Sequence, residues 1–230
     1  MKQLMENWRG FLKEGIDPRI KKQLDGLLAL PDVAVAITSA ESFGVAFRYV
    51  RVTDAESQQY TDLTRDDAEI YKDRKITKTG VPFGTVEIMK TVKQHDGPCY
   101  DGWMIFGTEA ERGWGPLLYE VALEWASENG GGLMSDRGIV SKYALAVWDK
   151  YAQRGDVAAR QMDVDHDLDQ GWMKQYPELT PDDKSDDCDQ GKAISMAGEK
   201  WAETSVSKIY KKQKPEVMQA LKAAGRLIVV

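Results

Sequence analysis

A glycine-containing turn is the segment whose residue types and spacing best suit ligand chemistry. The run Arg112–Pro116, with the sequence RGWGP, lies between an apolar strand-like run and the start of an amphipathic helix. The N–H groups of a helix's first turn have no partner within the helix, and the helix dipole attracts negative charge there. Glycines let a ligand approach the backbone without meeting a Cβ. The pattern predicts a phosphate site and a cofactor that carries a pyrophosphate.

Two other patterns of chemically capable residues are weaker. The alternating aspartates of Asp163–Asp169 resemble the start of a calcium loop, which needs Gly at its sixth position and Glu at its twelfth. This chain has Leu168 and Lys174 there, so we predict no metal site. The two histidines, His95 and His166, do not lie beside a Ser or Cys in a nucleophile-like pattern, which disfavours a hydrolase triad.

The composition is that of an ordinary globular chain with an acidic surplus. The 230 residues are 42% hydrophobic and 30% charged, which allows one substantial core. The net charge of −6 disfavours nonspecific binding to nucleic-acid backbones, because that binding depends on Lys and Arg neutralising phosphates. We therefore expect a basic or amine-bearing small molecule or protein as the partner, and no nucleic acid.

The apolar runs indicate neither a membrane span nor a secretion signal. No run approaches the roughly 20 apolar residues that a membrane-spanning helix needs, and residues 1–8 lack an apolar signal region. These features predict a cytoplasmic protein without membrane contact. Cys99 and Cys188 lack metal-ligand spacing and are too few for a disulfide framework, so we expect both to be reduced thiols.

The elements that precede the turn are expected to be two helices followed by four strands. Apolar residues recur at helical spacing over 2–14, and a second helix, capped by Asp17, ends at Pro31. A charged connection over 53–80, with a short helix near 64–72, separates the second strand from the third. Alternation of apolar and polar residues predicts strands over 33–37, 45–50, 84–92 and 100–107.

Helices and strands alternate after the turn. Apolar positions from Leu117 predict a helix that ends at Asn129 before three glycines. A strand at 133–134, a helix over 141–153, a strand over 161–164 and helices over 197–210 and 215–224 follow. This order predicts an α/β fold with a mixed sheet, antiparallel in its N-terminal strands and a parallel βαβ arrangement in its C-terminal half, with added N- and C-terminal helices.

The middle of the chain resembles the GNAT superfamily of N-acetyltransferases. The family's cofactor motif is R-x-x-G-x-G/A between a strand and a helix, and Arg112, Gly115 and Leu117 occupy its defined positions, with Leu117 in place of the small residue. The family pattern A-x-x-x-Y-x-x-x-G-F matches at Tyr151 and Gly155, with Val147 and Asp156 at its first and last positions. The resemblance covers roughly residues 33–164.

The resemblance implies a domain organisation and a cofactor. It suggests a helical arm over 1–31, a GNAT-like acetyltransferase domain over 32–170, and an irregular acidic segment with helices over 171–230. Acetyl-coenzyme A would lie in a V-shaped opening where the fourth and fifth strands separate. The implied cofactor-binding residues are Phe106, Arg112, Gly113, Trp114, Gly115 and Leu117.

Acetyl transfer to an amine needs a base and a proton donor for the departing thiolate. The resemblance implies Tyr151 as the general acid and Asp136, or else Glu87, as the base. Each residue also has a structural alternative: Asp136 as a turn residue beside Gly138, and Tyr151 as a core aromatic. The turn itself is, in the alternative, a plain strand-to-helix connection.

Two further phrases are similar to proteins encoded by tailed bacteriophages, namely Met5–Arg9 and Gly113–Tyr119. That likeness suggests a second possible function. The chain would then be a catalytically inactive GNAT-like phage structural or host-interaction protein. Such a protein would act through its terminal segments, in the host cytoplasm or in the virion. The first function is an acyl-coenzyme A-dependent N-acetyltransferase for an amine.

Overall fold

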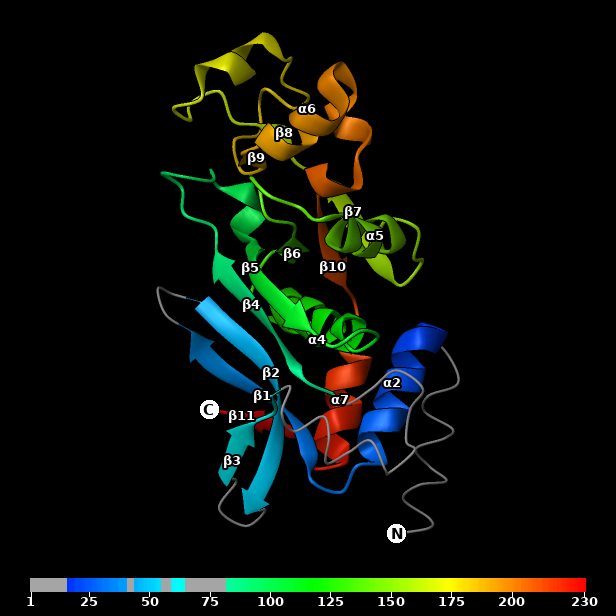
Figure 1. Ribbon diagram of the computed structural model, residues 1–230. Coiled ribbons are helices and arrows are strands. Elements are labelled where there is room, and N and C mark those ends of the chain that lie inside the picture. Colours follow the sequence, from blue (N-terminus) through cyan, green and yellow to red (C-terminus); the bar gives the residue numbers. More distant parts are fainter. Residues whose placement is uncertain (1–15, 41–43, 55–58, 65–81) are drawn as a thin grey trace.

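The structure is a computed structural model that describes residues 16–40, 44–54, 59–64 and 82–230 (Figure 1). Its centre is a mixed sheet with the strand order β11-β1-β2-β4-β5-β6-β10-β7, and β3 pairs with the outer part of β2. The strands of this sheet are β1 (Val33–Ala40), β2 (Gly44–Asp54), β3 (Gln59–Asp62), β4 (Gly84–Lys90), β5 (Trp103–Ala110), β6 (Leu133–Met134), β7 (Val157–Gln161), β10 (Lys208–Lys212) and β11 (Leu227–Val229).

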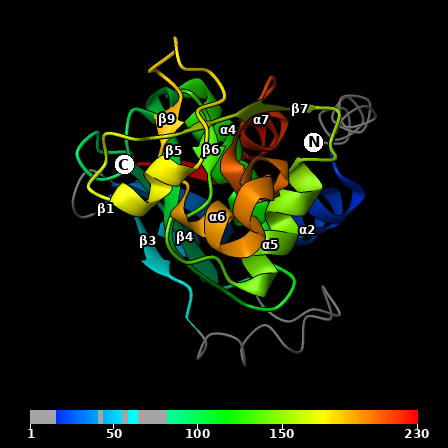
Figure 2. The same ribbon diagram turned by 90° about the horizontal axis from the view of Figure 1, so that it is seen from above.

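Five α-helices and four short 3-10 helices accompany the sheet in the described residues. The helices are α2 (Pro18–Leu28), α4 (Gly115–Glu128), α5 (Lys142–Tyr151), α6 (Gly191–Ala197) and α7 (Glu216–Ala223); the 3-10 helices are η2 (Cys99–Asp101), η3 (Gly171–Gln175), η4 (Gly198–Glu203) and η5 (Ser205–Ser207). A second, small sheet pairs β8 (Asp163–Val164) with β9 (Asp187–Cys188). The end of the molecule that carries α6, β8 and β9 lies opposite β3 (Figure 1). Seen from above, α6 and α5 overlie the rest of the molecule (Figure 2), and η5 contacts both of these helices.

The sheet directions confirm the predicted mixed α/β class. Neighbouring strands from β1 to β5 run antiparallel, and β6 then lies parallel to β5 after the α4 crossover. β10 enters between β6 and β7 and is antiparallel to both. β6 and β7 therefore share a direction but are not neighbours. The strand predicted over 161–164 was wrong in its bounds, since β7 ends at Gln161 and residues 163–164 form β8 of a separate sheet. β10 and β11, which come from residues 171–230, both belong to the main sheet.

Helix α4 lies against the sheet and contributes seven buried residues to the main hydrophobic core. Ten of its residues are buried, and it contacts β4, β10, α2 and α7. Its first position carries Gly115 followed by Pro116, and its last turn precedes three glycines, as the sequence predicted. For α2, the Asp17 side chain accepts the Arg19 N–H at 2.8 Å, which confirms the predicted cap.

Several predicted boundaries were wrong. β5 begins at Trp103 rather than at residue 100, because residues 99–101 have positive φ angles of 42°, 52° and 57° and form η2. The helix predicted over 197–210 was wrong, because α6 ends at Ala197 and the short 3-10 helices η4 and η5 follow it. Residues 208–210 belong to β10, in which Ile209 and Tyr210 are buried between β6 and β7. Tertiary pairing here overrides local propensity. The predicted helix over 2–14 and most of that near 64–72 lie outside the described residues.

The prediction that both cysteines are reduced was also wrong. Cys99 of η2 and Cys188 of β9 form a disulfide across 89 residues of sequence, with their Cα atoms 4.8 Å apart. Only the fold brings these two positions together, because the spacing of the cysteines carries no pairing information. A stable disulfide is unusual in a reducing cytoplasm, so the predicted location stays a prediction.

Candidate functional site

The main candidate site is a cleft where β5 separates from β6. The two strands pair only at Trp103 with Leu133 and at Met104 with Met134, while β5 continues to Ala110. From Ile105 onward, β5 therefore has a strand neighbour on its β4 side alone within the described chain. A cavity of about 160 Å³ lies here, lined by residues 105–108 of β5, Tyr119, Asp136, residues 139–141, Ala144 and Trp148.

Phe106 is placed at the mouth of this cleft by a β-bulge. Ile105 pairs with Ile88 and Gly107 with Glu87, so Phe106 is the extra residue of β5. Its side chain is 65% exposed, which is high for a phenylalanine. A bulge redirects a strand and leaves backbone polar groups without ladder partners. The cleft thus combines an apolar rim with a free strand edge.

Asp136 lines the same cavity and also closes a turn. Its Oδ1 accepts the N–H groups of Gly138 and Ile139, each at 2.7 Å. This is the turn geometry that the structural alternative described, and it holds the carboxylate in a defined orientation beside the cleft. The position is compatible with both roles.

In the glycine turn, part of the backbone and two side chains are already engaged by other parts of the protein. The N–H of Leu117 donates to Oε1 of Gln23 on α2 at 2.8 Å, and the Leu117 side chain is fully buried. Trp114 is also buried, and its backbone carbonyl accepts a hydrogen bond from the Tyr49 hydroxyl at 2.8 Å. Its ring packs in the core and cannot stack on the adenine of a cofactor from the solvent side. Arg112 is exposed at the start of the turn.

The two glycines of the turn differ in backbone conformation. Gly113 has a φ of 95°, which an L side chain adopts only with strain. Gly115 lies in ordinary helical geometry, and a Cβ there would meet Ala110 Cβ at a normal 3.5 Å. The backbone therefore requires glycine at position 113 but not at position 115. At Gly115 the missing side chain leaves space in which a ligand could approach the backbone.

Tyr151 lies outside the cleft. It packs with Trp148 and Tyr210 in an aromatic cluster and lines a second cavity of about 290 Å³ between α2, the turn and α5, together with Gly113 and Trp114. Its hydroxyl is buried without a hydrogen-bond partner among the described residues, and burial raises the pKa of Tyr151 well above its usual value. Its surroundings match the core-aromatic alternative.

Glu87 lies at a third place. It alternates with Val86 and Ile88, whose side chains pack into the core, so its carboxylate points to the other face of β4. There it pairs with Arg48 at 3.5 Å and lines a separate cavity. The structure thus brings Phe106 and Asp136 to one cavity, whereas Tyr151 and Glu87 line two others, Glu87 as the cross-strand partner of Gly107.

Comparison of the chain with protein-family models, with curated proteins and with solved structures gave no match. Among the helices that the structure describes, none is long and apolar enough to cross a membrane. The class that the structure defines is therefore a mixed α/β protein with a curled mixed sheet.

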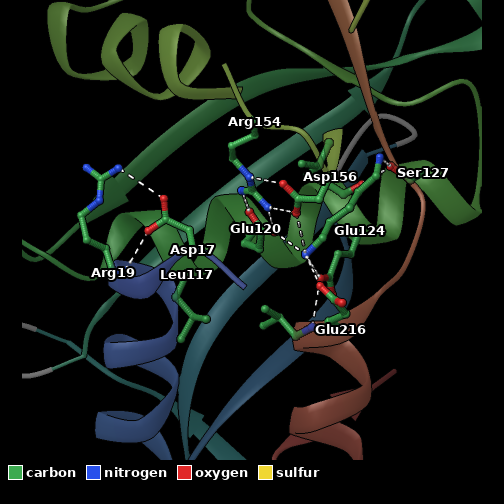
Figure 3. Close-up of polar contacts among 12 residues, drawn as sticks. Asp17, Arg19, Leu117, Glu120, Glu124, Ser127, Arg154, Asp156 and Glu216 are labelled. Carbon is green, nitrogen blue, oxygen red and sulfur yellow. Dashed lines mark hydrogen bonds and ion pairs between the residues drawn. The ribbon is translucent and has the colours of Figure 1, made fainter. Parts of the chain in front are cut away.

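A buried charge network is the feature that the sequence analysis missed (Figure 3). Lys212 of β10 donates to Glu120 at 2.6 Å and to Glu124 at 2.7 Å, both on α4. Arg154 makes a two-pronged contact with Glu120 at 2.6 and 2.8 Å and also pairs with Asp156. Two Glu four positions apart among the apolar residues of α4 were the available signal, because buried carboxylates need cations.

The network has a structural role, because it connects α4, β10 and α7 and its charged groups are buried. Glu124 also accepts the N–H groups of Val217 and Met218 in the first turn of α7, at 2.9 and 2.7 Å. Glu120, Glu124 and Lys212 are each at most 4% exposed, so the network joins α4, β10 and α7 inside the protein.

Glu124 makes stability depend on pH. Burial, and secondarily the nearby Glu120, raises the pKa of Glu124 from 4.5 to about 7, although Lys212 opposes this. The folded chain then holds this proton more tightly than the unfolded chain, so this contribution to the unfolding free energy falls as pH rises from 4.5 to about 7. We expect the unfolding free energy of Glu124→Gln to rise relative to that of the wild type as pH increases, by up to about 3 kcal/mol over this range.

Urea unfolding of both proteins at pH 5, 6, 7 and 8 measures this difference. Glu128→Gln is the control, since Glu128 is an exposed carboxylate on the same helix. A difference between Glu124→Gln and wild type that stays constant from pH 5 to 8 would contradict the assignment.

Proposed function

We propose that the protein binds acetyl-coenzyme A in the cleft between β5 and the β6–α5 connection and transfers the acetyl group to an amine. The observation that carries the proposal is the separation of β5 from β6 after two residue pairs, beside a cavity of about 160 Å³. The resemblance to N-acetyltransferases implies a cofactor opening between these same two consecutive strands. The acidic net charge of −6 suits an amine-bearing acceptor.

In this proposal each part of the cleft has a defined task. The free edge of β5 from Ile105 to Thr108 hydrogen-bonds the amides of the pantetheine arm. The N–H groups at Gly113 and Gly115 and the Arg112 guanidinium hold the pyrophosphate. Gln23 must release the Leu117 N–H if that donor also binds phosphate.

The chemical step forms a C–N bond and breaks the thioester C–S bond. The amine attacks the carbonyl carbon, the amine proton passes to a base, and the coenzyme leaves as a thiolate that takes up a proton. Asp136 is the base in this proposal, because its carboxylate lines the cleft. Tyr151 has no assigned task, since its ring packs in the aromatic cluster and its hydroxyl is buried, and Glu87 has none, since it pairs with Arg48 and lines another cavity.

Filling the cleft should abolish cofactor binding. Ala144 of α5 lines the cavity, whereas Ala146 of the same helix is exposed and does not. We expect calorimetric titration with acetyl-coenzyme A to show binding by the wild type and by Ala146→Trp, and affinity at least about tenfold lower in Ala144→Trp, a loss of about 1.4 kcal/mol or more. Arg112→Glu should weaken binding as well.

The same titration separates the proposal from its rival. If the wild type binds no acetyl-coenzyme A at millimolar concentration, the enzyme proposal fails. A non-catalytic interaction protein, such as a phage structural or host-interaction factor, then becomes the better candidate. The observation that favours this second function is the Gln23 side chain on the Leu117 N–H, which occupies one of the donors that a pyrophosphate would use.

A further inference from the structure

Three aspartates from distant parts of the sequence meet at the small β8–β9 sheet. Asp163 begins β8 and pairs in register with Asp187 of β9, and Asp186 directly precedes Asp187. One carboxylate oxygen from each residue lies within 4.8 Å of the others. All three residues are at most 4% exposed. A buried cluster of carboxylates costs free energy unless a cation or protons neutralise it.

The hydrogen bonds around the cluster are incomplete. Oδ1 of Asp186 is buried and has no hydrogen-bond partner in the described part of the chain. Its Oδ2 accepts the hydroxyls of Tyr100 at 2.8 Å and Thr180 at 2.9 Å. The Thr180 hydroxyl also lies 3.2 Å from Asp163 Oδ2, and with one proton it can donate to only one of the two carboxylates.

A second oxygen beside the cluster is also without a partner. Gln190 is 1% exposed, and its Nε2 donates to the backbone carbonyl of Asp163 at 3.3 Å. Its Oε1 is buried with no hydrogen bond from any described residue. The unsatisfied carboxylate oxygen of Asp186 lies in the cluster itself, and the unsatisfied amide oxygen belongs to a side chain that contacts the Asp163 backbone; a bound cation would complete such oxygens.

Protein cations compensate the cluster only partly. Lys184 lies 3.5 Å from Asp187, but its side chain is 58% exposed and also pairs with Glu178 at 3.0 Å. Asp163 is held by backbone N–H groups of Val164, Leu179 and Thr180, which fix its orientation. The Asp163 carboxylate is thus positioned in advance.

We propose that Asp163, Asp186 and Asp187 bind a hard divalent cation, Ca²⁺. The ligands are all oxygens, which Ca²⁺ and Mg²⁺ prefer. Around Ca²⁺, with Ca²⁺–O distances of about 2.4 Å, ligand oxygens lie up to about 4.8 Å apart, and the three oxygens of this cluster lie within that limit. Mg²⁺ usually keeps several of its waters, whereas Ca²⁺ accepts flexible sites built largely from protein oxygens, which suits three buried carboxylates.

The ion ties an irregular segment to the core. Between β8 and β9 the chain runs from residue 165 to 186 with η3 as its regular element. The cluster holds the two ends of this segment together, next to the Cys99–Cys188 disulfide. This site is independent of the proposed acetyl-coenzyme A cleft. It also differs from the loop that the sequence analysis considered, because two of its ligands come from residues 186 and 187.

Thermal unfolding after removal of metal with a chelator tests the proposal. At about 100 times its dissociation constant, CaCl₂ should raise the unfolding midpoint of the wild type by roughly 5 °C or more, and MgCl₂ should raise it less. Asp186→Asn should remove the Ca²⁺ effect. Asp182→Asn should keep it, since Asp182 is an exposed acid of the same segment.

Calorimetry with CaCl₂ gives the direct readout, with one site expected in the wild type. If Asp186→Asn does not fold, Asp187→Asn takes its place in both measurements. The proposal is overturned if the wild type shows neither a midpoint shift nor binding heat with Ca²⁺, if Mg²⁺ binds as tightly as Ca²⁺, or if the folded Asp variant binds Ca²⁺ like the wild type.

Discussion

Replacing Lys212 by methionine is expected to lower the free energy of unfolding by about 3–5 kcal/mol, because removal of one partner leaves buried charges uncompensated. Lys212 is 4% exposed and contacts Glu120 and Glu124 at 2.6 and 2.7 Å, with Glu216 at 3.5 Å. Methionine keeps the length of the side chain and removes the ammonium group. Urea unfolding at pH 7.5 measures the loss.

Lys211→Met is the matched control for this prediction. Lys211 is the neighbouring residue of β10, is exposed, and bonds the Gly130 carbonyl at 3.1 Å. Its replacement should change stability by about 0.5 kcal/mol or less. Adding Glu124→Gln to Lys212→Met should restore part of the stability, since it removes one of the stranded carboxylates. Equal effects of Lys211→Met and Lys212→Met would contradict the role of the buried network.

Loss of the disulfide is the second large effect. Cys99 and Cys188 close a loop across 89 residues, so the double variant Cys99→Ser/Cys188→Ser should lose about 4 kcal/mol of stability. The cross-link joins η2 to β9, where the Tyr100 N–H also donates to the Ser185 carbonyl at 2.7 Å. The expected loss includes loosening of this contact.

Unfolding of the oxidised wild type, of the wild type with a reductant, and of the double variant measures the disulfide's contribution. The reduced wild type and the double variant should have similar midpoints, both below that of the oxidised protein. Thiol labelling followed by mass measurement supplies the control, because an intact disulfide leaves both cysteines unlabelled. Labelling of both cysteines in native, non-reduced protein would contradict the pairing.

Much of the fold was predictable where local rules act. Asp17 and Pro18 mark the start of α2, and the three glycines after Asn129 mark the end of α4. The alternation of large apolar residues predicted β1, β2 and β4, and the large residues of β1 and β4 pack into the main core; in β1 the small residues between them are buried on the other face. The boundary of β5 was missed, because the left-handed backbone of η2 follows from the contacts of its residues with β9.

The candidate site was predictable only in part. The strand, turn and helix that border the cleft were identified, and Phe106 and Asp136 do line one cavity. Tyr151 matches a family spacing in the sequence, but the register of α5 directs it to Trp148 and Tyr210. Spacing along one helix specifies a face, whereas the neighbour of that face depends on how helices and sheet pack.

By itself, the sequence determined the features that depend on neighbours within a few residues: the ends of α2 and α4, the β1–β2 hairpin and the order of elements from β4 to α5. Only the tertiary structure decided the features made by residues far apart in the chain. These are the insertion of β10 between β6 and β7, the Cys99–Cys188 disulfide, the Lys212 network and the aspartate cluster. Local propensity arises from short-range sterics and hydrogen bonds, while such contacts form only when the whole chain buries its core.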